Sequence, residues 1–191
     1  MIGSSIMAKK FLIPLAIILL LVLGGLFLLK KQVQSQPGAG DKHAAAAQIG
    51  IGSTVPNIDL KPIGKPEIKL SDLKAKVYLI NFWATWCEAC VVEMPSIVRL
   101  YDTYKTKGLE VVSVSVDENP ESVVPNAVSK FKMTFPIFTD TQQKLAEIFD
   151  VHGIPLSIVL DANRNILQMD EGERDWNSPE FRAKLDKWLG G

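Results

Sequence analysis

The two cysteines of the 191-residue chain lie three positions apart, at Cys87 and Cys90, in the stretch NFWATWCEAC. An apolar run precedes this stretch and apolar residues at helical spacing follow it, so both cysteines should lie in the first turn of a helix. Side chains at positions i and i+3 share one helix face, which brings the two sulfur atoms within reach of a disulfide. The spacing therefore predicts a redox-active dithiol pair.

The two thiols should differ in reactivity. At a helix N-terminus, the helix dipole and the free backbone N–H groups stabilise an anion, which lowers the pKa of a thiol from its usual ~8.5. We therefore predict that Cys87 is the nucleophile that attacks a disulfide in another protein. Cys90 is then the resolving thiol, which releases the partner.

Other uses of a cysteine pair fit this sequence less well. Attachment of a c-type haem needs a histidine directly after the second cysteine, where Val91 stands. A structural zinc site takes four ligands, whereas the chain adds only His43 and the distant His152. A peroxidatic Pro-x-x-x-Thr-x-x-Cys pattern fails because Ile80 and Ala84 occupy its proline and threonine positions. An inert structural disulfide stays open as an alternative, and no cofactor or metal is implied.

The segments around the cysteines alternate between strand and helix patterns. Strands are predicted at 77–82, 109–116, 135–138, 156–160 and 166–169, and helices at about 91–107, 121–132, 140–150 and 178–189. A strand–helix–strand–helix order favours a parallel sheet core, which predicts an α/β fold. The Asp and Asn residues of 161–165 favour a turn between the last two strands. Residues 57–60 and 67–70 predict a small hairpin ahead of this core.

The N-terminal part of the chain has a different character. Residues 11–29 form an uncharged apolar run, which as a helix would reach nearly the ~30 Å of a bilayer's hydrocarbon core. A cleaved signal peptide has a shorter apolar region and a small-x-small cleavage site, whereas Leu-Leu-Lys-Lys follows here. We predict a leader at 1–10, an uncleaved transmembrane signal anchor at 11–29, a linker at 30–47 and one domain over 48–191.

The charge balance indicates no nucleic-acid partner. The formal net charge is zero, and from Gln48 onward 16 basic residues face 20 acidic ones. A mildly acidic domain lacks the basic surface that binds nucleic acid. Lysines stand on both sides of the apolar run, so the charges leave its orientation across a membrane open.

The cysteine stretch resembles the active-site signature of the thioredoxin superfamily, specifically the membrane-anchored ResA/TlpA-like thiol-disulfide oxidoreductases. The resemblance covers about Ile51 to the C-terminus. It rests on LSDLKAKVYLINFWATWCEAC, on Pro95 and on VHGIPLSIVLD. It implies a thioredoxin fold, in which helices flank a central mixed β-sheet, with an N-terminal β-hairpin extension.

The resemblance also implies roles for individual residues. Ile154 and Pro155 match the family's cis-proline loop, which lies against the disulfide and offers its backbone to an extended substrate strand. Asn81 stands where thioredoxin has a buried aspartate, and an amide cannot exchange protons with Cys90. Glu93 lies one helical turn beyond Cys90 and matches a glutamate that influences the cysteine pair in ResA-like proteins. We therefore expect Glu93 to assist proton transfer, and the alternative is a solvated helix glutamate.

Two residues next to Cys87 are expected to contact substrate, namely Trp86 and Glu88. A carboxylate beside the first thiol disfavours its thiolate, and a less stabilised reduced form makes the pair a better reductant. ResA-like proteins carry Cys-Glu-Pro-Cys, and here Ala89 replaces the proline. The alternative for Glu88 is an exposed acid without a role in the chemistry.

Together these features predict a membrane-tethered, extracytoplasmic (periplasmic) enzyme that reduces disulfides in client proteins. A membrane electron-transfer protein would supply its reducing equivalents. By resemblance the client is apocytochrome c, whose Cys-x-x-Cys-His thiols must be reduced before haem attachment. Two alternatives stay open: an oxidant or isomerase of secreted proteins, and a copper-handling or thiol-reducing module for cytochrome oxidase assembly.

Overall fold

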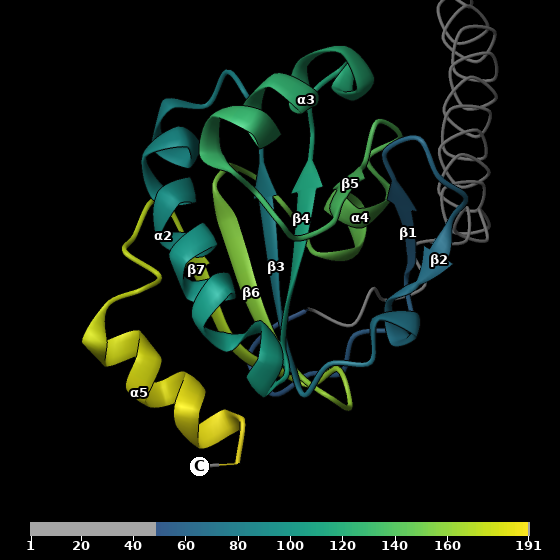
Figure 1. The fold of residues 1–191 in the computed structure, drawn as a ribbon. Coiled ribbons are helices and arrows are strands. Elements are labelled where there is room, and N and C mark those ends of the chain that lie inside the picture. The colour runs from purple at the N-terminus through teal and green to yellow at the C-terminus, as the bar shows by residue number, and fades with distance from the viewer. Residues whose placement is uncertain (1–48, 191) are drawn as a thin grey trace, which may run out of the picture. The chain divides into compact units, whose positions relative to one another are not determined.

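The computed structural model describes residues 49–190, and its centre is a seven-stranded sheet in the order β2-β1-β5-β4-β3-β6-β7 (Figure 1). The strands are β1 Asp59–Pro62, β2 Ile68–Lys69, β3 Val77–Trp83, β4 Leu109–Ser115, β5 Ile137–Thr139, β6 Leu156–Asp161 and β7 Ile166–Glu171. The helices are α2 Glu88–Tyr104, α3 Pro120–Phe131, α4 Lys144–Ile148 and α5 Pro179–Trp188, with short 3-10 turns at Leu70–Leu73 and Lys105–Lys107.

The strand pairing is that of a thioredoxin fold with an N-terminal extension. Strands β3, β4 and β5 run parallel, whereas β6 pairs antiparallel with β3 and β7 antiparallel with β6. The predicted N-terminal hairpin is β1 and β2, and β1 also pairs antiparallel with β5, so the hairpin widens the sheet. The fold class expected from the sequence is confirmed.

Strand β3 lies at the centre, and its residues are buried on both sides of the sheet. Its alternate residues Val77, Leu79 and Trp83 belong to the core that lies under α2, α3 and α5. Its other residues, such as Ile80 and Phe82, belong to the core that α4 and the segment before β1 cover. Because side chains alternate along a strand, one strand serves both cores and is fixed firmly in the middle of the sheet.

Several predicted boundaries differ from the observed ones. Strand β5 begins at Ile137 instead of residue 135, because Pro136 has no N–H for the sheet ladder. Helix α4 begins only at Lys144, because Gln143 has a left-handed backbone (φ 57°). The carboxylate of Asp140 nevertheless accepts hydrogen bonds from two N–H groups at the start of α4, as a helix cap does. The first strand of the hairpin lies two residues further along than the predicted 57–60.

No helix within residues 49–190 is long and apolar enough to cross a bilayer. The predicted leader, signal anchor and linker all lie outside the described residues. Their prediction rests on the sequence.

Candidate active site

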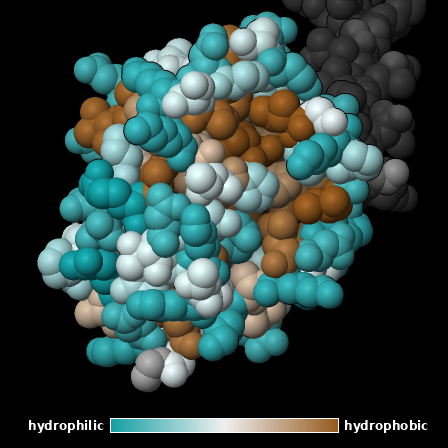
Figure 2. All heavy atoms as spheres, viewed as in Figure 1, coloured by the Kyte–Doolittle hydropathy of each residue, from teal (hydrophilic) through white to brown (hydrophobic). Residues whose placement is uncertain are grey.

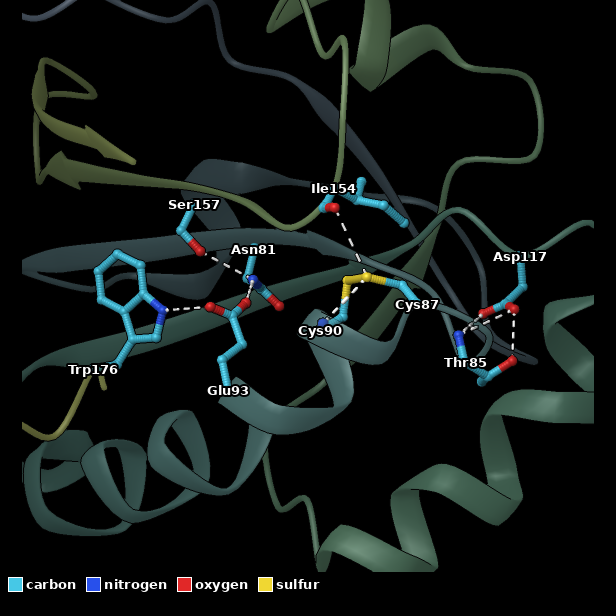
Figure 3. The surroundings of a disulfide bond; sticks show 9 residues. All are labelled: Asn81, Thr85, Cys87, Cys90, Glu93, Asp117, Ile154, Ser157 and Trp176. Carbon is cyan, nitrogen blue, oxygen red and sulfur yellow. Dashed lines mark hydrogen bonds between the residues drawn. A yellow bond between two sulfur atoms is a disulfide. The ribbon is translucent and has the colours of Figure 1, made fainter. Parts of the chain in front are cut away.

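The two cysteines form a disulfide at the N-terminus of α2, directly after β3 (Figure 3). Cys87 is the N-cap residue of the helix, and its sulfur accepts a hydrogen bond from the backbone N–H of Cys90 at 3.2 Å. This N–H is one of the first N–H groups of a helix, which have no partner within the helix itself. The helix N-terminus therefore directs a donor at Cys87 Sγ, the atom on which a thiolate would form.

The two sulfur-bearing residues are unequally exposed. Cys87 is 7% exposed, whereas Cys90 is fully buried beneath it. A protein partner approaching from solvent therefore reaches Cys87 first. The order of reactivity predicted from the sequence agrees with this difference in access.

The cis-proline loop lies against the disulfide. The Ile154–Pro155 peptide bond is cis, as the resemblance implied. Cys87 Sγ lies 3.8 Å from the carbonyl oxygen of Ile154. In the disulfide form this sulfur carries no proton, so the approach is a contact and becomes a possible hydrogen bond only after reduction. Ile154 and Val116 each pack against both cores, so they lie at the sheet edge where the two layers meet.

The space-filling view in Figure 2, taken from the same side as Figure 1, shows apolar residues gathered near the carboxyl ends of β4 and β5 and beside α4. Strands β3, β4 and β5 are parallel, so their carboxyl ends lie at one edge of the sheet. Because Cys87 follows the end of β3, the disulfide lies at the same edge as this apolar surface.

Glu93 is buried and hydrogen-bonded, so it is not a solvated helix glutamate. Its side chain is 2% exposed, and one carboxylate oxygen accepts from Asn81 Nδ2 at 2.8 Å. The other oxygen accepts from the indole Nε1 of Trp176 at 3.1 Å. Burial raises the pKa of Glu93 above its ordinary 4.5, and the hydrogen bonds from Trp176 and Asn81 partly oppose that shift. The structure therefore places a carboxyl group with a raised pKa one helical turn from Cys90.

Asn81 connects this carboxylate to the sheet. Its residue partner on β6 is Ser157, and Asn81 Nδ2 also donates to Ser157 Oγ at 2.9 Å. The amide thus holds Glu93 against two strands of the sheet. As seen in Figure 3, Trp176, Glu93, Asn81 and Ser157 form one continuous network beside the disulfide.

A second buried carboxylate holds the loop that leads into Cys87. Asp117 is 3% exposed and accepts from the Thr85 backbone N–H at 3.1 Å and from the Thr85 hydroxyl at 2.7 Å. It also accepts from Ser115 Oγ at 2.9 Å. Thr85 lies two residues before Cys87, so these bonds fix the path of the chain from β3 into α2.

The two remaining predicted site residues, Trp86 and Glu88, lie on the surface. Trp86 is 70% exposed beside Cys87, and Glu88 is exposed at the first position of α2. Trp83, which is also close in sequence, is fully buried in the core. His152 is exposed and lies 3.2 Å from the carboxylate of Asp150. The structure therefore brings together the cysteines, Glu93 and the cis-proline loop, and leaves Trp86 and Glu88 facing solvent.

Three residues of this site were not predicted from the sequence: Trp176, Ser157 and Asp117. Ser157 had a detectable signal, because a polar residue in an apolar strand pattern needs a buried partner. Asp117 had a weaker one, since it directly follows a strand beside the cysteine stretch. Trp176 had none, because 83 residues separate it from Glu93. Within residues 49–190, no group of three or more His, Cys, Asp or Glu side chains is placed to hold a metal ion.

Comparison with known proteins agrees with this geometry. The Redoxin family model matches residues 51–185. The chain is 36% identical over 124 residues to the thiol-disulfide oxidoreductase ResA of Geobacillus kaustophilus, covering 65% of this chain and 71% of that protein. It is 33% identical over 129 residues to ResA of Bacillus subtilis, covering 68% and 72%. Among solved structures, a Chlorobium tepidum protein assigned as thiol:disulfide interchange protein DsbE superposes with a TM-score of 0.67 at 25% identity. That match covers 74% of this chain and 99% of the other.

Proposed function

The chain belongs to the Redoxin family and is a protein-disulfide oxidoreductase, and we propose that it works in the reducing direction, on disulfides of extracytoplasmic client proteins. The proposal concerns the direction of electron flow, the client and the place of action. Each has its own support in the site or in the sequence.

The observation that carries the direction is the charge on α2 around the disulfide. Glu88 and Glu93 are the charged residues in the first two turns of this helix, and its first basic residue is Arg99. Negative charge near a thiol disfavours the thiolate. A reduced form that is less stabilised makes a dithiol pair a better reductant, whereas strong oxidants stabilise their reduced form.

The mechanism follows from the difference in access between the two sulfurs. The thiolate of reduced Cys87 attacks one sulfur of the client disulfide, and the other client sulfur leaves as a thiol after taking up a proton. Cys90 gives up its proton, for which Glu93 is the nearby carboxylate, and its sulfur attacks Cys87 Sγ. The mixed disulfide breaks, the second client thiol leaves, and the Cys87–Cys90 disulfide forms. Two electrons and two protons have then passed to the client.

The contacts around Cys87 fit an extended client segment. The carbonyl oxygen of Ile154 lies 3.8 Å from Cys87 Sγ, and the exposed Trp86 directly precedes Cys87 in the chain. We assign Ile154, Pro155, Trp86 and Glu88 to substrate contact. The resemblance to ResA/TlpA-like proteins supports apocytochrome c as the client and a membrane electron-transfer protein as the reductant. The apolar run at 11–29 supports a membrane anchor, and the resemblance to ResA/TlpA-like proteins supports a position of the domain outside the cytoplasm.

Trapping tests the direction and the client together. In the full-length chain with Cys90→Ser, Cys87 attacks a client disulfide but has no resolving thiol, so a mixed disulfide accumulates. We expect this variant to trap an oxidised Cys-x-x-Cys-His peptide, and the matched Cys87→Ser variant to trap far less because Cys90 is fully buried. Equal trapping by both variants would contradict the assigned roles. Wild-type protein that oxidises the reduced peptide, in place of reducing the oxidised one, would contradict the direction.

A further inference from the structure

Asn81 carries a feature that the chemistry above does not explain. Its side chain is 1% exposed, and its amide nitrogen donates to both Glu93 and Ser157. Among the described residues, its carbonyl oxygen Oδ1 has no hydrogen-bond partner. Buried acceptors of this kind are nearly always paired in folded proteins, so an unpaired one next to a redox centre calls for a partner that appears in another state.

The orientation of the amide follows from its neighbours. An indole N–H can only donate, so the Glu93 oxygen that contacts Trp176 is an acceptor. When Glu93 is ionised, its other carboxylate oxygen also accepts, so Asn81 presents its NH₂ group to it. Oδ1 is thereby turned away from Glu93. Figure 3 shows this oxygen on the side of the network that faces the disulfide.

The register of the sheet places Asn81 under the cysteine-bearing helix. Asn81 lies between Leu79 and Trp83 on the same face of β3, because every second residue of a strand shares a face. Leu79 and Trp83 belong to the same core as Cys90 and Met94 of α2. Cys90 lies one turn before Glu93, the residue that Asn81 contacts directly, and both are buried against the sheet. Residues three apart on a helix lie on one face, so Cys90 and Glu93 both lie on the face of α2 that packs against β3.

We propose that Asn81 Oδ1 accepts a hydrogen bond from the thiol of Cys90 when the pair is reduced. Reduction breaks the Cys87–Cys90 bond, and a donor dithiol supplies two electrons and two protons while it becomes a disulfide. Cys90 Sγ takes up one of these protons and directs it at Oδ1. In the disulfide form Sγ carries no proton, which explains why the acceptor is unpaired in this structure. Asn81 is then a positioning residue for the resolving thiol.

The contact has a direct consequence for redox equilibrium. It exists only in the dithiol form, so it stabilises that form relative to the disulfide. The carboxylate of Glu93 accepts from the same amide and strengthens Oδ1 as an acceptor, because hydrogen bonds in a chain polarise one another. The contact belongs to the resting dithiol, since Cys90 has lost its proton by the time it attacks the mixed disulfide.

This inference rests on the Cys87–Cys90 pair of the proposed function but not on its direction or its client. Its test is spectroscopic and needs no client, so its failure would leave the reductase proposal standing. Conversely, a failure to trap the peptide would leave the Asn81 contact untouched.

Infrared spectroscopy of the S–H stretch gives the direct test. In the full-length chain with Cys87→Ser, Cys90 is the only thiol, because the chain has two cysteines. We expect its S–H band at lower frequency than that of an alkyl thiol dissolved in an apolar solvent, in which the thiol has no hydrogen-bond acceptor. Adding Asn81→Leu, which is similar in size but lacks the acceptor, should return the band to the unbonded frequency. A band at the unbonded frequency before that second change would overturn the proposal without any variant at Asn81.

Two control variants separate Asn81 from its neighbours. Ser157→Ala removes one acceptor of the amide NH₂ but leaves Oδ1 in place. Ser113, the residue partner of Asn81 on β4, has a buried hydroxyl that is also unpaired among the described residues, and Ser113→Ala removes it. Both variants should leave the shifted S–H band where it is. A band that moves in Ser113→Ala and stays in Asn81→Leu would assign the thiol's partner to Ser113 and overturn the proposal.

The redox equilibrium gives a second, independent readout. With both cysteines present, Asn81→Leu should lower the equilibrium constant for reduction about threefold to about tenfold, which for a two-electron couple makes the potential ~15 to ~30 mV more negative. Trp176→Phe removes a hydrogen bond from Glu93 but leaves Oδ1 intact, so it should not reproduce that shift. An unchanged or less negative potential in Asn81→Leu would contradict the proposal.

Discussion

Replacing Trp176 with phenylalanine isolates one hydrogen bond to the buried carboxylate beside the disulfide. The change removes the indole N–H that donates to Glu93 at 3.1 Å and keeps an aromatic ring against Phe181, whose ring centre lies 4.8 Å away. A hydrogen bond to a charged group is worth about 1.5 to 3 kcal/mol. The smaller ring in a fully buried site adds on the order of 1 kcal/mol.

The two contributions separate by their dependence on pH. Burial raises the pKa of Glu93 above 4.5 in the folded protein, so the free energy of unfolding is highest below the unfolded-state pKa and falls as pH rises through the folded one. The indole donor opposes this rise, because it stabilises the ionised carboxylate. Without it the pKa of Glu93 rises further. Above the folded-state pKa of Glu93 in the variant, Trp176→Phe should show its full loss of unfolding free energy. Below the folded-state pKa of Glu93 in the wild type, only the loss from packing should remain.

Urea unfolding of the full-length chain, followed at several pH values on both sides of this pKa, measures the deficit. Trp188→Phe is the matched control, since Trp188 packs against Phe181 at 6.1 Å and has no hydrogen bond to Glu93. Its deficit should not depend on the ionisation of Glu93. In a Glu93→Gln background the pH-dependent part of the Trp176→Phe deficit should also vanish. A deficit that is the same at every pH would refute the reasoning about this bond.

Three further predictions concern the acids of the site. Glu93→Gln should change the pH dependence of the Cys87–Cys90 potential, because it removes the raised-pKa group next to the pair; identical pH profiles would speak against that role. Glu88→Gln should make the potential less negative by less than the ~30 mV of a tenfold change, and added salt should shrink the difference, because Glu88 is exposed. Asp117→Asn should lower the free energy of unfolding by about 2 kcal/mol, since an amide has one oxygen for the donors of Thr85 and Ser115; an unchanged urea midpoint would contradict this.

Local patterns were enough to predict the elements that carry the cysteines. The apolar run of β3, the helical spacing after Cys90 and the turn-forming Asp and Asn residues of 161–165 each depend on neighbouring residues, so local patterns predict these elements. The two parallel pairings, β3 with β4 and β4 with β5, follow from the strand–helix–strand order. The helix at 140–150 was predicted, but the start of α4 was not predictable in this way, because a single left-handed residue, Gln143, delays it to Lys144.

The site residues that lie close together in sequence were predictable, whereas the contacts between distant segments were not. Spacing indicates the pairing of Cys87 with Cys90 and the position of Glu93 one turn later. The burial of Glu93 depends on Trp176, which comes from the segment between β7 and α5 and reaches the site only through the tertiary fold. Asn81 shows the same limit: its residue type excludes proton exchange, whereas its unpaired oxygen appears only once Ser157 and Glu93 are placed.

An equilibrium redox titration of the full-length chain shows whether the cysteine pair is a reductant or an oxidant. The Cys87–Cys90 disulfide is followed against a dithiol buffer of known potential. We expect a potential near or below the ~−270 mV of thioredoxin, as for a pair that reduces its clients. A potential near the ~−120 mV of a strong oxidant would contradict the reducing direction.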